Sequence, residues 1–133
     1  MSYRSWLKEF YPVPASNQMT NLEALKHAHL KFTGALPENL AKHGLKFEEG
    51  VLKSKSRKYD FFTSDTCSLC QKYIMNGCRR CPLFLKYAGS FKTNCSTFGV
   101  GAFSIFRLTR DPKPMLAVLE RLIENLEKKS QSA

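Results

Sequence analysis

The sequence has few acidic side chains where its positive charge is highest. Residues 51–95 contain nine Lys and Arg but only two carboxylates, Asp60 and Asp65, and the whole chain of 133 residues has a formal net charge of +10. A two-metal nuclease requires several converging carboxylates, so this composition argues against that class of enzyme. The concentrated positive charge instead favours binding of a polyanion, with nucleic acid as the first candidate. The alternative is surplus lysine that serves solubility.

Common catalytic motifs are also absent. The chain contains no P-loop, G-x-G-x-x-G, H-E-x-x-H or G-x-S-x-G. Its three histidines precede the cysteines and form no recognisable pair with them. No apolar run approaches the roughly twenty residues needed to cross a bilayer. We therefore expect a soluble, non-catalytic protein with a single domain.

Cysteine is missing from the first half and the last quarter of the chain, because all five cysteines lie between residues 67 and 95. Four of them form two C-x-x-C pairs that are seven residues apart, Cys67/Cys70 and Cys78/Cys81. Two such turns can present four thiolates to one cation, which is the arrangement that structural zinc favours. The sequence therefore predicts one Zn²⁺ per chain, held by these four side chains.

Two other interpretations of the cysteines remain open. Four cysteines with a C-x-x-C-P ending are compatible with an iron–sulfur cluster. Disulfides are disfavoured because five is an odd number and the first residues do not form a secretory signal peptide, so we expect a reducing cytoplasm. Cys95 is either an alternative metal ligand or a buried thiol that packs as a small apolar side chain.

The pattern C-x-L-C, C-x-x-C-P-L and a later lone cysteine covers residues 67–83 and Cys95. It resembles a pattern in small cysteine-rich proteins encoded by bacteriophages and prophages. The resemblance covers less than a quarter of the chain. It implies a prokaryotic or viral cytoplasmic setting, which is the host cytoplasm for a phage protein, and it implies no particular activity.

Two groups of cations flank or enter the cysteine segment. If residues 53–59 form one extended strand, Lys53, Lys55, Arg57 and Tyr59 share a face that suits phosphates and a stacked base. The competing interpretation is a mobile surface loop with solvated charges. Arg79 and Arg80 lie between the cysteines of the second pair, where a metal would hold them ready for bidentate phosphate contacts; the alternative is that both are merely solvated. The predicted nucleic-acid-binding residues are Lys53, Lys55, Arg57, Lys58, Tyr59, Arg79 and Arg80.

The first fifty residues predict helices. Thr20 and Glu23 have the spacing of a capping box, which predicts a helix through about Phe32. Pro37–His43 is a second short helix that ends at a glycine. Ser5–Tyr11 is a short helix or extended arm whose aromatic side chains dock on the core.

The remaining segments predict one hairpin and two more helices. Leu45–Leu52 contains a Glu-Glu-Gly turn between apolar runs, which indicates a small β-hairpin. Phe98–Leu108 is a buried helix or a central strand, with the helix preferred. Asp111 and the following proline start the longest helix. Its apolar stripe, Met115–Leu126, closes the core or contacts a second copy or another protein.

These observations predict a mainly α fold, with α+β possible, in one domain over residues 1–133. A helical part (1–50) precedes a basic, cysteine-rich zinc module (51–95) and a C-terminal helical part (96–129). The favoured function is a zinc-stabilised protein that contacts RNA or DNA through its basic surface. The alternative is a phage-type protein that binds and inhibits or redirects a host protein, either through Met115–Leu126 or through the aromatic N-terminal arm.

Overall fold

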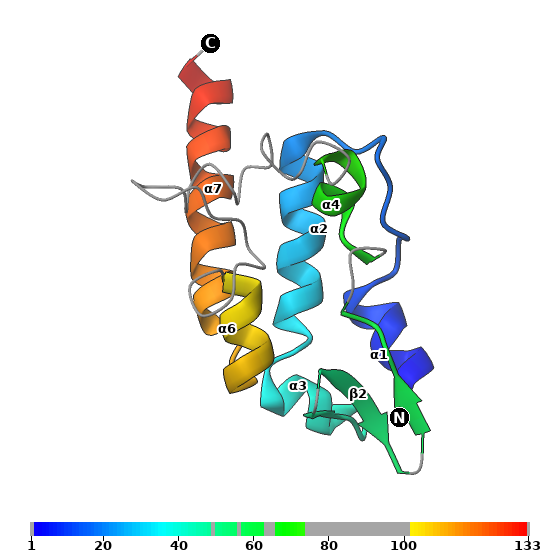
Figure 1. The fold of residues 1–133 in the computed structure, drawn as a ribbon. Coiled ribbons are helices and arrows are strands. Elements are labelled where there is room, and N and C mark those ends of the chain that lie inside the picture. The colour runs from blue at the N-terminus through cyan, green and yellow to red at the C-terminus, as the bar shows by residue number, and fades with distance from the viewer. Residues whose placement is uncertain (1, 49, 56, 63–65, 74–101, 133) are drawn as a thin grey trace.

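The computed structural model describes residues 2–48, 50–55, 57–62, 66–73 and 102–132 (Figure 1). These ranges form helices and one small antiparallel sheet, which confirms the mainly helical fold with a β component. Among the described helices, none combines the length and the apolar character needed to cross a membrane. The C-terminus and the sheet lie at opposite ends of the molecule.

The N-terminal segment is a helix and not an extended arm. α1 spans Tyr3–Phe10, followed closely by Pro12. Ser2 and Ser5 cap its first turn reciprocally, since the side-chain oxygen of each accepts a hydrogen bond from the backbone N–H of the other, at 3.2 and 2.8 Å. Both donors would otherwise lack a partner at a helix start.

The next two helices form where the sequence predicts them. α2 spans Asn21–Thr33, and the capping box is present because the N–H of Thr20 donates to Glu23 Oε1 at 2.9 Å and the N–H of Glu23 donates to Thr20 Oγ1 at 3.1 Å. α3 spans Pro37–Lys42 with proline in its first turn. Gly44 follows it with φ of 70°, a conformation that glycine adopts at little cost.

Three short strands form a sheet in the order β1-β2-β3, with both pairs antiparallel. β1 spans Lys46–Glu48, β2 spans Val51–Ser54 and β3 spans Arg57–Tyr59. Gly50 has φ of 80° in the first turn, as the Glu-Glu-Gly sequence predicts, and Lys55 has φ of 53° in the second. The predicted hairpin is therefore confirmed and extended by a third strand.

The second half of the described chain is helical. α4 spans Ser68–Tyr73, α6 spans Ala102–Thr109 and α7 spans Lys113–Ser132. The preference for a helix near residues 98–108 is confirmed from residue 102 onward. Asp111 Oδ1 accepts a hydrogen bond from the N–H of the first residue of α7 at 3.0 Å. Pro112 comes just before the helix, so α7 begins one residue later than predicted and continues past Lys128.

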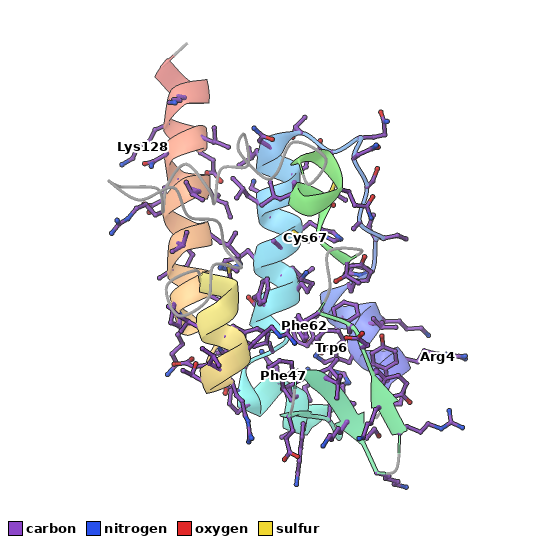
Figure 2. All side chains as sticks on the ribbon, viewed as in Figure 1. Arg4, Trp6, Phe47, Phe62, Cys67 and Lys128 are labelled. Atoms are coloured by element: carbon purple, nitrogen blue, oxygen red, sulfur yellow. The ribbon has the colours of Figure 1, made fainter. Side chains whose placement is uncertain are left out.

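The helices pack around an aromatic core that the sheet closes at one end (Figure 2). Phe47 of β1 stacks on Phe106 of α6, with 4.4 Å between ring centroids. Phe62 lies 5.5 Å from Phe32 of α2 and 5.1 Å from Phe106. Because these rings come from separate elements, they join α2, α6 and the sheet into one core. α7 packs along α2 and α6, as predicted for its apolar stripe.

The N-terminal aromatic residues dock on this core as predicted. Trp6 is fully buried and Phe10 is 5% exposed. The indole N–H of Trp6 donates to the carbonyl oxygen of Gly34 at 2.9 Å, so the polar atom of the ring is satisfied inside the protein. Phe61 meets Trp6 edge to face at 5.0 Å. α1 is therefore an integral part of the fold.

Candidate functional site

The basic segment folds back on itself, so residues 53–59 are neither the one extended strand nor the surface loop that the sequence left as alternatives. The Cα partners across the β2–β3 pair are Ser54 and Arg57 next to the turn, and Lys53 and Lys58 further along. Lys55, in the left-handed region, reverses the chain between the two strands. The turn resets the alternation of side chains, so the face that Lys53, Lys55, Arg57 and Tyr59 would share in one extended strand does not form.

The register of the sheet instead places three lysines in one row. Lys46 on β1 is the Cα partner of Lys53 on β2, which is in turn the partner of Lys58 on β3. Directly opposed residues point to the same side of a sheet. Phe47 and Leu52 alternate with them, are buried, and face the core. The lysine row, which we define as Lys46, Lys53 and Lys58, therefore lies on the outer face.

The lysine row is only partly neutralised. Lys46 and Lys58 are exposed, and neither makes an ion pair within the ranges that the structure describes. Lys53 lies 3.6 Å from Glu48 Oε2 and is 23% exposed. Like charges directly opposite each other destabilise a sheet, so the row lowers folding stability in the isolated protein. A bound polyanion would remove that repulsion.

Two more cations lie at the tip of the β2–β3 hairpin, beside the lysine row, although Arg57, the Cα partner of Ser54, starts from the opposite side of the sheet to Lys58. Lys55 and Arg57 are both exposed, and no ion pair engages either of them in the described part of the chain. Arg4 is exposed on α1, and the residue before it, Tyr3, contacts β3. Figure 2 shows the Arg4 side chain extending away from the protein. Lys46 was not among the predicted contacts, since only the register of the sheet brings it into the row.

Tyr59 already has an aromatic partner inside the protein. Its ring stacks on Tyr3 with 3.9 Å between centroids and an angle of 13° between planes. Tyr3 continues the stack to Trp6 at 6.4 Å and 9°. Burial, and then the neighbouring Tyr59, raise the pKa of the Tyr3 hydroxyl above its ordinary value. The predicted role of Tyr59 in stacking a base thus has a competing structural role in fixing α1 to the sheet.

The first cysteine pair lies at the start of a helix. Cys67 is buried just before α4, and its carbonyl oxygen accepts a hydrogen bond from the N–H of Gln71 at 3.0 Å. Cys70 lies one turn along, in α4 itself. The first C-x-x-C pair therefore spans the start of α4.

Cys78, Cys81 and Cys95 lie outside the described residues, and so do Arg79 and Arg80. Within the described ranges, no three His, Cys, Asp or Glu side chains converge to hold a metal ion. Because Cys78 and Cys81 lie outside the described residues, the predicted four-thiolate site stays a prediction.

A buried lysine anchors the chain as it enters the cysteine segment. Lys31 of α2 is 1% exposed, and its ammonium donates to the carbonyl oxygen of Thr66 at 3.2 Å. The same nitrogen lies 4.9 Å from the centroid of the Phe32 ring. On the other side of Cys67 in the sequence, Ser68 is fully buried, and its Oγ accepts a hydrogen bond from the N–H of Ser16 at 3.0 Å. These contacts fix Cys67 against the core.

His43 connects α3 to α1 and does not belong to the basic surface. Its Nδ1 lies 2.8 Å from Ser5 Oγ, and its Nε2 lies 2.7 Å from Glu9 Oε1. Lys42 donates to the other oxygen of Glu9 at 3.0 Å. The hydrogen bond from His43, and then that from Lys42, hold the pKa of the Glu9 carboxyl below its ordinary value. Ser5 Oγ also bonds the backbone of Ser2, so this hydroxyl serves the helix cap.

The other two histidines are tied to neighbouring segments, in different directions as their spacing predicts. His27 Nε2 lies 2.7 Å from the carbonyl oxygen of Val13, and His29 Nε2 lies 3.0 Å from Glu120 Oε1 on α7. Both contacts join α2 to other parts of the fold.

The surfaces considered for a protein partner are largely used by the core. Trp6 and Phe10 are buried. In α7, Met115, Leu116 and Leu119 are buried, and the rest of the stripe is partly buried against the core. The N-terminal aromatic residues and the start of Met115–Leu126 therefore have structural partners within the chain.

Comparison with known proteins provides no family for this chain. No protein-family model, no curated protein and no solved structure matches it. Function is therefore inferred from the positions and chemistry of the described side chains and from the sequence.

Proposed function

We propose that the protein binds nucleic acid through the lysine row and the two cations at the hairpin tip, Lys55 and Arg57. The observation that carries this proposal is the register of the sheet, which aligns three lysines across three strands on the outer face. With the hairpin tip, five cations lie on three short strands and one turn, and Glu48 pairs with one of them, Lys53.

The physical basis is release of counterions from the phosphate backbone. Each cation that neutralises a phosphate releases a condensed counterion, so affinity falls as salt rises. The sheet holds the backbones of Lys53 and Lys58 in register, which lowers the entropy lost on binding relative to cations on an unstructured segment. Such contacts position a nucleic acid without reading its sequence. We therefore expect weak sequence preference.

The cysteine segment extends the proposal. Cys67, Cys70, Cys78 and Cys81 would hold one Zn²⁺, with Cys95 as the alternative ligand, and the closed site would be structural. Arg79 and Arg80 would then add two cations close to a rigid metal site. Elemental analysis of the purified protein tests this part. One zinc per chain supports the site, whereas iron or the absence of metal contradicts it.

A salt titration of binding tests the basic surface. Fluorescence anisotropy would measure the affinity of labelled single-stranded DNA, single-stranded RNA and duplex DNA between about 50 and 200 mM salt, the range over which phosphate contacts dominate. The test variant is Arg57→Gln/Lys58→Gln, because both side chains are exposed and make no ion pair in the described ranges. The plot of log K against log salt has a negative slope, and removing two phosphate contacts should make it less steep by about 1.4–1.8.

The matched control is Lys113→Gln/Arg121→Gln. Both residues are exposed on α7, and this variant removes the same charge away from the sheet. It should retain most of the wild-type affinity and nearly the same slope. If both double variants weaken binding equally, binding reflects net charge and the assignment to the sheet is wrong. Absence of binding to all three nucleic acids by zinc-loaded protein would favour a protein partner instead.

A further inference from the structure

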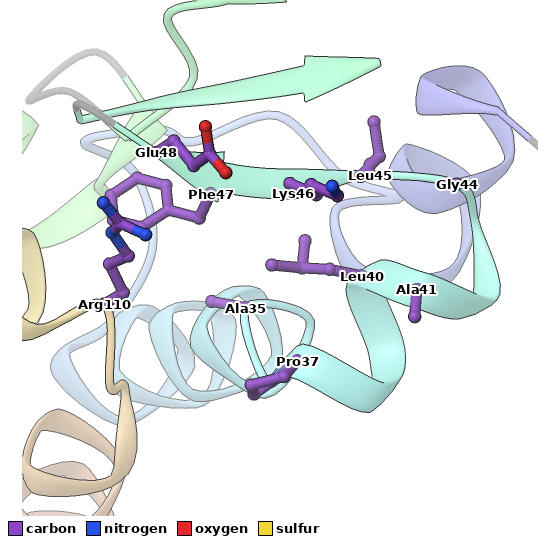
Figure 3. A pocket seen from close by; sticks show the side chains of 10 residues that line it. All are labelled: Ala35, Pro37, Leu40, Ala41, Gly44, Leu45, Lys46, Phe47, Glu48 and Arg110. Carbon is purple, nitrogen blue, oxygen red and sulfur yellow. The ribbon is translucent and has the colours of Figure 1, made fainter. Parts of the chain in front are cut away.

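A pocket that shares Lys46 with the lysine row opens between α3 and the edge strand β1 (Figure 3). Its volume is about 540 Å³, within the range of about 300–1,000 Å³ that is typical of small-molecule sites. α3 and the residues beside it line one side, β1 lines the other, and Arg110 closes one end. No described residue of the cysteine segment or of the hairpin tip lines it.

The wall of the pocket is largely apolar. Ala35, Leu40, Leu45 and Phe47 are part of the buried core and also border this space. An apolar group that entered would therefore contact carbon atoms and displace water from them, which is favourable in proportion to the area covered.

Two cations at the pocket lack an internal counter-ion in the part of the chain that the structure describes. Lys46 and Arg110 both border the opening, and neither makes an ion pair or a side-chain hydrogen bond there. The one carboxylate of the lining, Glu48, lies 3.6 Å from Lys53 and is therefore already paired. The opening thus offers positive charge next to an apolar wall.

The backbone at Arg110 gives a second, independent indication. Its N–H donates to the carbonyl oxygen of Phe106 at 2.7 Å, which ends α6, and its φ is 66°. Glycine is the residue that normally occupies a left-handed position after a helix, because a side chain there is strained. An arginine at this position accepts the backbone strain that glycine would avoid, and it brings a guanidinium to the pocket. Figure 3 shows the guanidinium turned toward Phe47 and Glu48. Strain of this kind concentrates at binding sites.

We infer that this pocket binds a small amphipathic organic anion, with its apolar body against Leu40 and Phe47 and its acidic head on Arg110 and Lys46. A guanidinium can bind a carboxylate or a phosphate through two parallel hydrogen bonds, which is why the head group is assigned to Arg110. This site goes beyond the proposed binding of nucleic acid and does not depend on it.

Three probes with one chain length separate the contributions. Octanoate carries a carboxylate, octyl phosphate carries a phosphate, and octanol carries no charge. Calorimetric titration into the full-length protein would give affinities, and amide chemical shifts would locate the site. We expect octanoate or octyl phosphate to shift the amides of residues 35–48 and 110, and octanol to bind at least about tenfold more weakly, the factor expected for one charge-assisted hydrogen bond. The stronger of the two anions identifies the head group.

The test variant is Arg110→Asn, since asparagine tolerates the left-handed conformation and removes the charge. Lys55→Asn is the matched control because Lys55 is also an exposed cation with a positive φ, in the β2–β3 turn away from the pocket. Arg110→Asn should weaken binding of the preferred anion at least about tenfold and leave octanol unchanged, whereas Lys55→Asn should change neither. Lys46→Gln provides a second charge deletion should Arg110→Asn not fold.

Filling the pocket tests the apolar part. Ala41 is exposed on α3 and lines the opening, so Ala41→Phe should weaken the anions and octanol alike. The inference is overturned if octanol binds as tightly as the anions, if the shifted amides lie elsewhere, or if Arg110→Asn binds the anion as the wild type does. Retention of nucleic-acid binding by Arg110→Asn would show that Arg110 serves the pocket and not the nucleic-acid surface, with which the pocket shares Lys46.

Discussion

The ring of Tyr3 stacks on the ring of Tyr59 with 3.9 Å between their centroids. This contact joins the first turn of α1 to the last strand of the sheet, two segments that are far apart in the sequence. It also explains how the helix that carries Trp6 is oriented, since the ring planes of Tyr3 and Trp6 are nearly parallel. An aromatic residue in a basic segment can therefore have a structural purpose.

The stack gives a first prediction about Tyr59. Tyr59→Ala should lower the free energy of unfolding by about 1–3 kcal/mol, because both buried ring area and the aromatic pair are lost. Tyr59→Phe keeps the ring and should change stability little. Urea denaturation measures both. If Tyr59→Phe has normal stability but weakened nucleic-acid binding, the hydroxyl has a direct role at the interface.

A second prediction concerns the dependence of stability on pH. The pKa of Glu9 is lowered in the folded protein, mainly by the hydrogen bond from His43. A carboxyl whose folded pKa is below its unfolded value stabilises the protein above the unfolded pKa, and this contribution disappears as pH falls through the folded pKa. The wild-type protein should therefore lose free energy of unfolding as the pH falls from neutral to below the ordinary pKa of Glu. Glu9→Gln should lose less over the same interval.

Denaturation with urea at a series of pH values would measure this effect. Glu124→Gln is the matched control, because Glu124 is exposed on α7 and makes no ion pair in the described ranges. It should leave the pH profile unchanged. Equal profiles for wild type and Glu9→Gln would show that the carboxylate of Glu9 contributes nothing to acid sensitivity.

The buried ammonium of Lys31 gives a third prediction. Lys31→Ala should lower the free energy of unfolding by about 2–4 kcal/mol, because it removes buried methylene groups and leaves the carbonyl of Thr66 without this donor. Lys26→Ala is the control on the same helix. Lys26 is 56% exposed and pairs with Glu127 at 3.5 Å, a surface contact that contributes about 0–1 kcal/mol. A similar effect of both substitutions would contradict the anchoring role of Lys31.

Local signals made much of the fold predictable. The capping box at Thr20, the proline that begins α3 and the Glu-Glu-Gly turn each specify backbone geometry within a few residues, and each prediction is confirmed. The third strand was missed because the turn at Lys55 has the sequence Ser-Lys-Ser-Arg, which contains none of the Gly, Asn or Asp residues that mark a tight hairpin.

The candidate site was less predictable because distant contacts define it. Lys46 joins the lysine row only through the pairing of β1 with β2, and its position in the sequence does not indicate that pairing. Lys31 was not expected inside the core, since lysine is seldom buried without a partner, and its partner Thr66 is 35 residues away. The metal ligands were predictable as a pattern, but Cys78 and Cys81 lie outside the described residues.

A fourth prediction uses the close contact between Gly34 and Phe10. A Cβ atom at Gly34 would lie 2.6 Å from Cγ of Phe10, whose ring is buried. Gly34→Ala should lower the free energy of unfolding by about 1–3 kcal/mol through overpacking, although its α-helical φ suits alanine. In a Phe10→Ala background the same substitution should have a much smaller effect. Equal effects in both backgrounds would exclude this contact as the cause.

The last prediction links stability to function at the lysine row. Lys58→Glu would replace a like-charge pair opposite Lys53 with an opposite-charge pair, so it should raise the free energy of unfolding by about 0.2–1 kcal/mol at low salt. The gain should shrink in high salt, since exposed charges are screened. The same variant should weaken nucleic-acid binding more than Lys58→Gln does, because it adds repulsion from phosphate. If Lys58→Glu is more stable and binds nucleic acid more weakly, the lysines are aligned for a polyanion at the expense of the isolated fold. If it is less stable and its nucleic-acid binding is unchanged, Lys58 serves folding alone.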